Sequence, residues 1–148
     1  MNFAIDRVEK GVSEKMLFCG DYSETLPLDT RTMMEFLSER LDRRIGTLKW
    51  ISIGHSTSTF EDAQRLRAFL QLPENASGTV LITTDCYNMW RVRWIFSRIL
   101  KNDIQRACFA QTPEKFTNLD PKTWWKREKD FLYVFNEILK GIYYLFKY

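Results

Sequence analysis

Apolar residues along the chain follow two alternating patterns, which predict strands separated by helices. Short apolar runs begin near residues 16, 48, 79 and 104, and each has the length of a buried strand. Between these runs, apolar residues recur at every third or fourth position, as on the buried face of a helix. Strands that alternate with helices are typical of parallel sheets. The sequence therefore predicts a single α/β domain over residues 1–148, with a short parallel sheet of about four strands and helices on both faces.

The clearest of these units lies between Gly78 and Arg98. Its apolar run over 80–82 predicts a strand, and the polar residues 83–85 predict a turn in which Asp85 caps the next helix. Ligands of parallel α/β proteins bind where a strand passes into a helix in this way. The apolar face of the helix is expected to consist of Met89, Val92, Phe96 and Ile99.

The remaining elements follow from the same patterns. Further strands are expected over 16–19, 48–53 and 104–110. Helices are expected over 2–13, with Val12 on the apolar face, and from residue 29 to a stop at Gly46. Another should begin at Ser58, which forms a capping box with Glu61. The last helix is expected to begin at Asp120, with Pro121 in its first turn, and to bury Phe131, Phe135, Ile138, Ile142 and Phe146.

The composition is that of an ordinary globular protein, and it excludes several classes of function. Hydrophobic residues make up 45% of the chain and charged residues 28%, and no run approaches the roughly 20 apolar residues of a membrane span. The net charge of +3 is too small to indicate nucleic-acid binding. One histidine excludes a multi-histidine metal site. Three scattered cysteines and no signal peptide predict a cytoplasmic protein without a disulfide framework.

The candidate site residues follow from the expected sheet topology. Parallel strands end at the same edge of a sheet, so the loops 20–26, 54–59, 83–88 and 111–118 should lie together. Helix N-termini at two of these loops offer free N–H groups, which together with hydroxyl groups suit a phosphate or another anion. The same residue types are favoured as helix caps whatever the function. The expected ligand-binding residues are Ser56, Thr57, Thr59, Glu61, Thr84, Asp85, Asn88 and Arg91.

Two residues at this edge have alternative interpretations. Arg91 lies two turns into its helix, where it either reaches a bound anion or stacks on aromatic residues of its own helix. His55 is either a general base, with Glu61 or Asp85 as its acidic partner, or a solvated loop residue. The sequence contains neither a P-loop nor a Gly-x-Gly-x-x-Gly motif, so the cofactor, if there is one, stays unknown.

Three segments, in order and spacing, resemble the bacterial YdcF/SanA/ElyC-type domain. Residues 56–63 (STSTFEDA) resemble the family's Ser-Thr-Asn-Thr-x-Glu-Asn-Ala motif, and residues 83–91 (TTDCYNMWR) resemble its Thr-Ser-x-x-Tyr-His-Met-x-Arg motif. Glu137, Gly141 and Tyr144 resemble its closing Glu-x-x-x-Gly-x-x-Tyr pattern, and Cys19-Gly20 stands in place of its Gly-Gly. The resemblance implies a Rossmann-like three-layer sandwich, a link with the bacterial cell envelope and a nucleotide-type ligand. It also adds Gly20 to the expected ligand-binding residues.

The chain departs from the family pattern in ways that bear on function. Asn88 stands where the family has histidine, and Ser58 and Asp62 replace family asparagines. The family's first strand and glycine-rich turn have no counterpart, since this sequence begins at the following helix. The resemblance therefore implies an incomplete sheet, whose open edge invites pairing with a partner or with a second copy in a homodimer.

Three functional hypotheses follow. The first is a small-ligand-binding domain that holds an anionic or nucleotide-like metabolite at the carboxyl-terminal edge of the sheet, where Arg91 neutralises its charge. The second is a hydrolase or transferase acting on a phosphate-containing substrate. Its candidate catalytic residues are His55, Glu61 and Asp85. The third is a protein-interaction module, with an aromatic surface formed by Trp90, Trp94 and Trp124.

Overall fold

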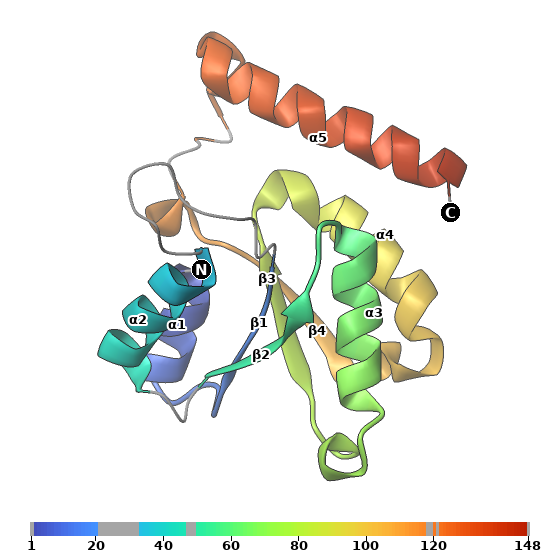
Figure 1. Cartoon of the computed structure of the whole chain (residues 1–148). Coiled ribbons are helices and arrows are strands. Elements are labelled where there is room, and N and C mark those ends of the chain that lie inside the picture. The colour runs from blue at the N-terminus through green and yellow to red at the C-terminus, as the bar shows by residue number, and fades with distance from the viewer. Residues whose placement is uncertain (1, 21–32, 47–49, 118–119, 121, 148) are drawn as a thin grey trace.

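The computed structural model describes residues 2–20, 33–46, 50–117, 120 and 122–147 (Figure 1). In chain order, the helices and strands are α1 (Asn2–Glu9), β1 (Met16–Gly20), α2 (Met33–Ile45), β2 (Trp50–His55), α3 (Thr59–Leu70), β3 (Val80–Thr84), α4 (Cys86–Leu100), β4 (Ala107–Gln111) and α5 (Glu128–Lys147). Short 3₁₀ helices cover Pro73–Asn75, Lys101–Arg106, Glu114–Phe116 and Trp124–Lys126. The predicted mixed α/β class is confirmed.

The strands form two parallel pairs instead of one sheet. β1 pairs with β2, starting with Met16 opposite Trp50, and β3 pairs with β4 in continuous register from Val80 to Thr84. Among the described residues, no pairing joins one pair to the other. A cavity lined by both β1 and β3 lies between the pairs. The predicted parallel pairing is therefore confirmed, and a single four-stranded sheet is not.

All four strands run in the same general direction, toward the end of the molecule where α5 lies (Figure 1). In this view α1 and α2 lie on one side of the strands, and α3 and α4 lie on the other. One buried apolar cluster joins α3 and α4 to β3 and β4 and includes Leu70, Ile95 and Leu100. A second cluster ties α1 and α2 to β1 and includes Ile5 and Leu41. Each large side chain buried in this way stabilises the fold by about 1.5–3 kcal/mol.

Local capping signals set several helix ends as the sequence predicts. Ser58 caps α3 by accepting a hydrogen bond from the backbone N–H of Glu61 at 3.3 Å. Gly46 follows the last residue of α2 with a φ of +81°, a left-handed conformation that glycine adopts without strain. Asp85 occupies the N-cap position of α4, but its side chain makes no capping hydrogen bond.

Other boundaries differ from the prediction. α1 ends at Glu9, because Gly11 turns the chain with a φ of +68°, and this leaves Val12 exposed. The strand predicted to begin at residue 104 begins at Ala107, since 101–106 form a 3₁₀ helix. β2 and β3 extend to His55 and Thr84, into segments predicted as turns. The helix start predicted at residue 29 and the strand start predicted at 48 lie outside the described residues.

The last helix departs furthest from the prediction. It begins at Glu128, whereas the Asp120 carboxylate accepts hydrogen bonds from the N–H of Lys122 at 2.8 Å and the hydroxyl of Thr123 at 2.7 Å, in a separate turn. Pro121 lies outside the described residues. The face predicted to be buried is 43–89% exposed along its length: Phe131, Phe135, Ile138, Ile142 and Phe146. The buried residues are instead Asp130, Val134, Glu137, Gly141 and Tyr144.

The physical reason for this difference is the contact between α5 and α4. Glu137 forms an ion pair with Arg91 of α4, so a charged residue faces inward. A Cβ atom built on Gly141 would lie 2.1 Å from the ring of Trp90, so the absence of a side chain lets the two helices approach. A polar pair and a glycine thus decide which face of α5 is buried, in place of its apolar stripe.

Candidate functional site

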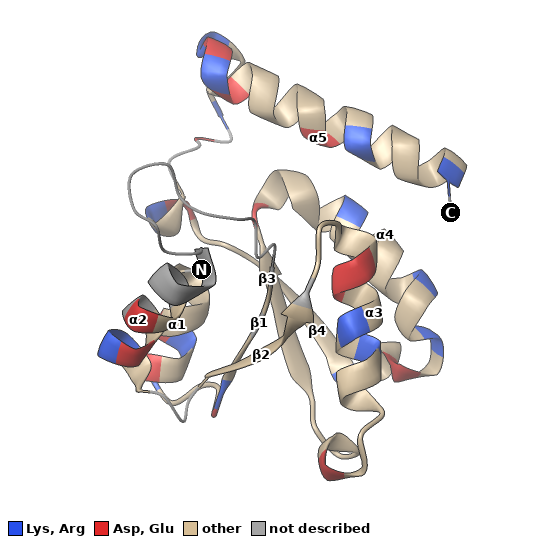
Figure 2. Ribbon diagram, viewed as in Figure 1, with Lys and Arg blue, Asp and Glu red and all other residues tan. Residues whose placement is uncertain are grey.

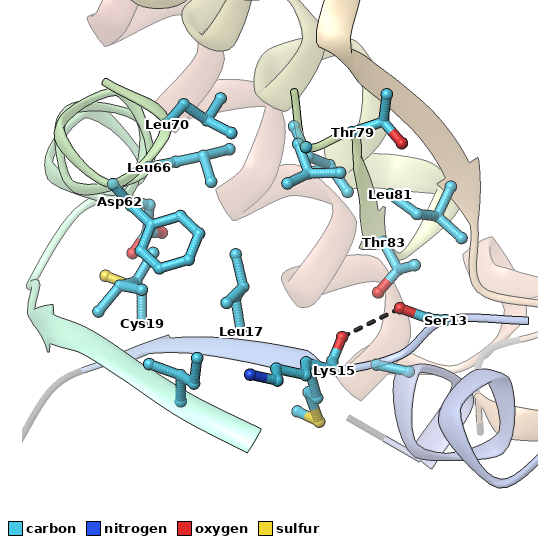
Figure 3. Close-up of a pocket in the computed structure, with 18 of the residues that line it drawn as sticks. Ser13, Lys15, Leu17, Cys19, Asp62, Leu66, Leu70, Thr79, Leu81 and Thr83 are labelled. Atoms are coloured by element: carbon cyan, nitrogen blue, oxygen red, sulfur yellow. Dashed lines mark hydrogen bonds between the residues drawn. The ribbon is translucent and has the colours of Figure 1, made fainter. Parts of the chain in front are cut away.

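The carboxyl ends of β1 and β3 and the N-termini of α3 and α4 meet at one end of a cavity of about 800 Å³. We call this space the central cavity. β1 and β3 form its sides, α3 and α4 line it from one direction, and α1 with residues 12–15 line it from another. Figure 3 shows Leu17 of β1 and Thr83 of β3 on opposite sides of the space, near Leu66 of α3.

The loop from β2 into α3 is held by its own side chains. The buried hydroxyl of Ser56 donates to the carboxylate of Asp62. The Oε2 atom of Glu61 accepts hydrogen bonds from the N–H and the hydroxyl of Thr57, at 2.7 and 3.0 Å. These hydrogen bonds fix the position of Thr57 relative to the first turn of α3.

Arg91 lies at the centre of the site, where it is only 7% exposed. Its Nη1 donates to the Thr59 hydroxyl, and its Nη2 lies 3.3 Å from Oδ1 of Asn88 and 2.5 Å from Oε2 of Glu137. Its guanidinium carbon lies 5.7 Å from the ring centroid of Tyr144. One buried arginine thus brings together α3, α4 and α5, and with them residues from all three motif segments.

The nitrogen Nε of Arg91 is also buried, but it has no hydrogen-bond partner among the described residues. Arg91 lines the central cavity together with Thr59, Thr84 and Asn88. Because a buried N–H group without an acceptor costs about 1–3 kcal/mol, this atom marks a position where an acceptor in the cavity would stabilise the protein.

The carboxylate of Glu137 is shared between Arg91 and a second cation. Glu137 accepts from Arg91 through one carboxylate oxygen and from Nζ of Lys140, at 2.7 Å, through the other. Two cations therefore share one carboxylate. On the far side, the amide of Asn88 donates to the hydroxyl of Tyr133 at 3.2 Å. Burial raises the pKa of the Tyr133 hydroxyl, which favours its neutral form.

The other predicted site residues are placed differently. Gly20 ends β1 and pairs with His55 at the end of β2, after a shift in register that follows Phe18. The side chain of His55 lies outside the described part of the structure, so its predicted role as a base stays a prediction. Among the described residues, those that line the central cavity do not include Ser56, Thr57, Glu61 or Asp85.

The sequence patterns did not identify three residues that lie near the site. Asp62 and Cys19 line the central cavity, and Lys140 is the second cation on Glu137. The spacing of Glu137 and Lys140, three residues apart on a helix, is a signal that could have identified this pair. Burial raises the pKa of the Cys19 thiol to about 11. The thiol is therefore protonated at neutral pH and is a poor nucleophile.

The aromatic residues near the site mainly pack helices together. The guanidinium of Arg98 lies 4.9 Å from the ring centroid of Trp94, as expected for arginine stacked on an aromatic neighbour. Trp124 packs edge-on against Tyr87 and stacks on Phe131 of α5, with ring centroids 6.2 and 6.1 Å apart. The 3₁₀ helix at Trp124 therefore connects α4 with the start of α5.

Comparisons with known proteins give no indication of the function. No protein-family model, curated protein or solved structure matches the chain. The resemblance to the YdcF/SanA/ElyC-type domain therefore stays a prediction. None of the described helices combines the length and apolar character needed to cross a membrane, and the described residues contain no group of three or more potential metal-ligating side chains.

Proposed function

We propose that the chain binds a small anionic or nucleotide-like metabolite at the carboxyl-terminal end of the central cavity. The observation that supports this most strongly is the buried Nε–H group of Arg91, which lacks an acceptor among the described residues. An oxygen of a phosphate or carboxylate group would accept this hydrogen bond, and charge-assisted bonds of this kind are about twice as strong as neutral ones.

The surroundings of Arg91 suit such a ligand. The hydroxyl oxygen of Thr59 accepts from Arg91, which leaves the hydroxyl proton free to be donated into the cavity. Thr84 adds a second hydroxyl at the end of β3. Glu137 is shared between Arg91 and Lys140, so its single negative charge does not neutralise both cations. A link with the bacterial envelope rests on the motif resemblance alone.

A thermal-shift screen tests this proposal. The panel contains nucleotides, S-adenosylmethionine, sugar nucleotides, polyprenyl-phosphate analogues and divalent metals. A ligand at 100 times its dissociation constant stabilises a protein by about 2.7 kcal/mol. We expect an anionic compound to raise the melting temperature, and we expect Thr84→Val to reduce that shift.

Thr112→Val is the matched control, because Thr112 directly follows β4 and is not among the described lining residues. It should leave the ligand-induced shift unchanged. A panel without any shift, or a shift that Thr84→Val and Thr59→Val both leave intact, would contradict the proposal.

The surface of α5 favours self-association as a second candidate function. Besides the five residues predicted to be buried, α5 exposes Leu132, Leu139, Tyr143 and Leu145. Long stretches of this helix carry no charge (Figure 2). Contiguous exposed apolar surface of this kind typically marks an interaction site.

Light scattering at increasing protein concentration tests self-association. The mass should rise with concentration in the wild type and much less in Ile142→Lys. Leu72→Lys is the control, since Leu72 lies outside α5 and is 43% exposed, close to the 44% of Ile142. A constant mass for the wild type would remove this second function.

A further inference from the structure

The two strand pairs present open edges to each other across the central cavity. In the described part of the chain, β1 pairs with β2 and β3 pairs with β4, and neither β1 nor β3 has a second neighbour. An edge strand carries a row of backbone N–H and C=O groups that can pair with another strand. Here two such edges face one space.

The residues that line the cavity show that it runs along these edges. Every residue from Val80 to Thr84 lines it, as do the neighbours Met16 and Leu17 of β1. Successive residues of a strand point to opposite faces of a sheet, so consecutive lining residues indicate contact with a strand edge. Among its described side chains, β2 contributes only Ile51 and Ile53, which alternate and therefore share one face.

The cavity has room for one strand. Strands lie about 4.8 Å apart, rise about 3.3 Å per residue and occupy a layer about 10 Å thick, so each residue fills about 160 Å³. Five residues, the length of β1 and of β3, would fill about 800 Å³. The cavity volume is about 800 Å³.

The walls of the cavity specify the chemistry of that strand. Leu66, Leu70 and Phe96 line it from α3 and α4, while Ala4 and Val8 line it from α1. Charged residues, among them Arg7, Lys15 and Asp62, line the cavity as well, so a strand in this position would have apolar neighbours on both faces for part of its length. Strands buried on both faces typically consist of continuous apolar residues. Leu81 of β3 is 41% exposed at this edge and would be covered.

We propose that one extended, apolar polypeptide segment of about five residues inserts between β1 and β3, parallel to both, and joins the two strand pairs into one sheet. The segment comes from a partner of this chemistry. The insertion is a separate proposal from the anion site, which lies at the carboxyl-terminal end of the cavity around Arg91. A strand that fills the cavity would displace the anion, so the two occupants exclude each other.

A fused strand tests this proposal in the full chain. The residue at the start of α1 lies near the carboxyl ends of the strands (Figure 1), so a strand joined before Met1 by a short Gly-Ser linker can run parallel to β1. We would fuse Val-Ile-Val-Leu-Val and compare it with a control in which the second and fourth residues are proline, which lacks the N–H group needed for pairing.

We expect the apolar fusion to raise the melting temperature by about 5 °C or more and the proline fusion to leave it unchanged. Hydrogen exchange should slow at the amides of β1 and β3 in the apolar fusion. Leu81→Lys should reduce both effects, because it places a charge in the cavity. Leu72→Lys, with a similarly exposed leucine outside the cavity, should retain them.

Addition of the same apolar peptide in trans, with flanking lysines for solubility, should protect the same amides in the wild-type chain. Equal melting temperatures and equal exchange for the apolar and proline fusions would overturn the proposal. It would also be overturned if a fatty acid, but no peptide, raised the melting temperature without protecting β1 and β3, because the occupant would then be a small apolar molecule.

Discussion

Helices α4 and α5 are both rich in apolar residues, yet they bury them in opposite ways. On α4, the predicted residues Met89, Val92 and Phe96 are buried, whereas the predicted face of α5 is exposed. α4 packs against α3 and the β3–β4 pair, while the main contacts of α5 are with α4 and the 3₁₀ helix at Trp124. Figure 1 shows α5 lying across the end of the domain.

The difference shows what apolar spacing can and cannot specify. Spacing identifies a face that can be buried, but burial also requires a neighbouring surface of matching shape. α4 has such surfaces on two sides. For α5, the contact with α4 is set by the Arg91–Glu137 ion pair and by Gly141 beneath Trp90, and the apolar stripe is left on the outside.

Substitution of Arg91 should lower the free energy of unfolding the most, because Arg91 holds α4 and α5 together. Arg91→Met leaves the buried Glu137 carboxylate with Lys140 alone, and removal of one partner of a buried ion pair typically costs about 3–5 kcal/mol. Urea unfolding would measure the loss. The double variant Arg91→Met, Glu137→Leu should recover much of it, since no buried charge is left. A loss no larger than that of Arg98→Met, an exposed arginine of the same helix, would contradict the central role of Arg91.

The core of α4 should be the next most sensitive position. Ile95 is 1% exposed, and Ile95→Ala should lower the free energy of unfolding by about 2–5 kcal/mol, because it removes buried methyl groups and leaves a cavity. Phe146→Ala on α5 removes a larger side chain that is 89% exposed, and it should change stability by less than about 0.5 kcal/mol. Similar losses for the two variants in thermal unfolding would show that α5 buries its apolar stripe in solution.

A methyl group added at position 141 should push α5 away from α4. Gly141→Ala places a carbon against the Trp90 ring, and overpacking of this kind costs about 1–3 kcal/mol. The double variant Gly141→Ala, Trp90→Ala should be less destabilised than the sum of the two single variants. Additive losses in denaturant unfolding would mean that the close contact does not control the approach of α5.

Substitution of Lys140 should change the free energy of unfolding the least. Its side chain is 58% exposed, so Lys140→Met should cost less than about 1 kcal/mol. The loss should shrink further at high salt, because salt screens exposed charges. Unfolding at low and high ionic strength would measure this. A loss as large as that of Arg91→Met would show that Glu137 depends equally on both cations.

Local chemistry made much of the fold predictable. The apolar runs of β1 and β3, the Ser58 cap and the Gly46 stop depend on neighbouring residues, and each appears where the sequence places it. Only part of the cavity lining was predictable in this way, since Ser56, Thr57, Glu61 and Asp85 are not among its described lining residues. Thr59 and Asn88 lie in first helical turns, Thr84 ends β3 and Arg91 follows in the second turn of α4, and all four line the central cavity.

Contacts between distant segments were decided only by the tertiary structure. The sequence by itself determined that the chain would alternate strands and helices, because apolar spacing and caps act over a few residues. It did not determine that β1 and β3 would stay apart, since strand pairing depends on backbone groups that every residue shares. Nor did it determine which face of α5 would turn inward, because the partner of Glu137 lies 46 residues away and becomes its neighbour only when α4 and α5 cross.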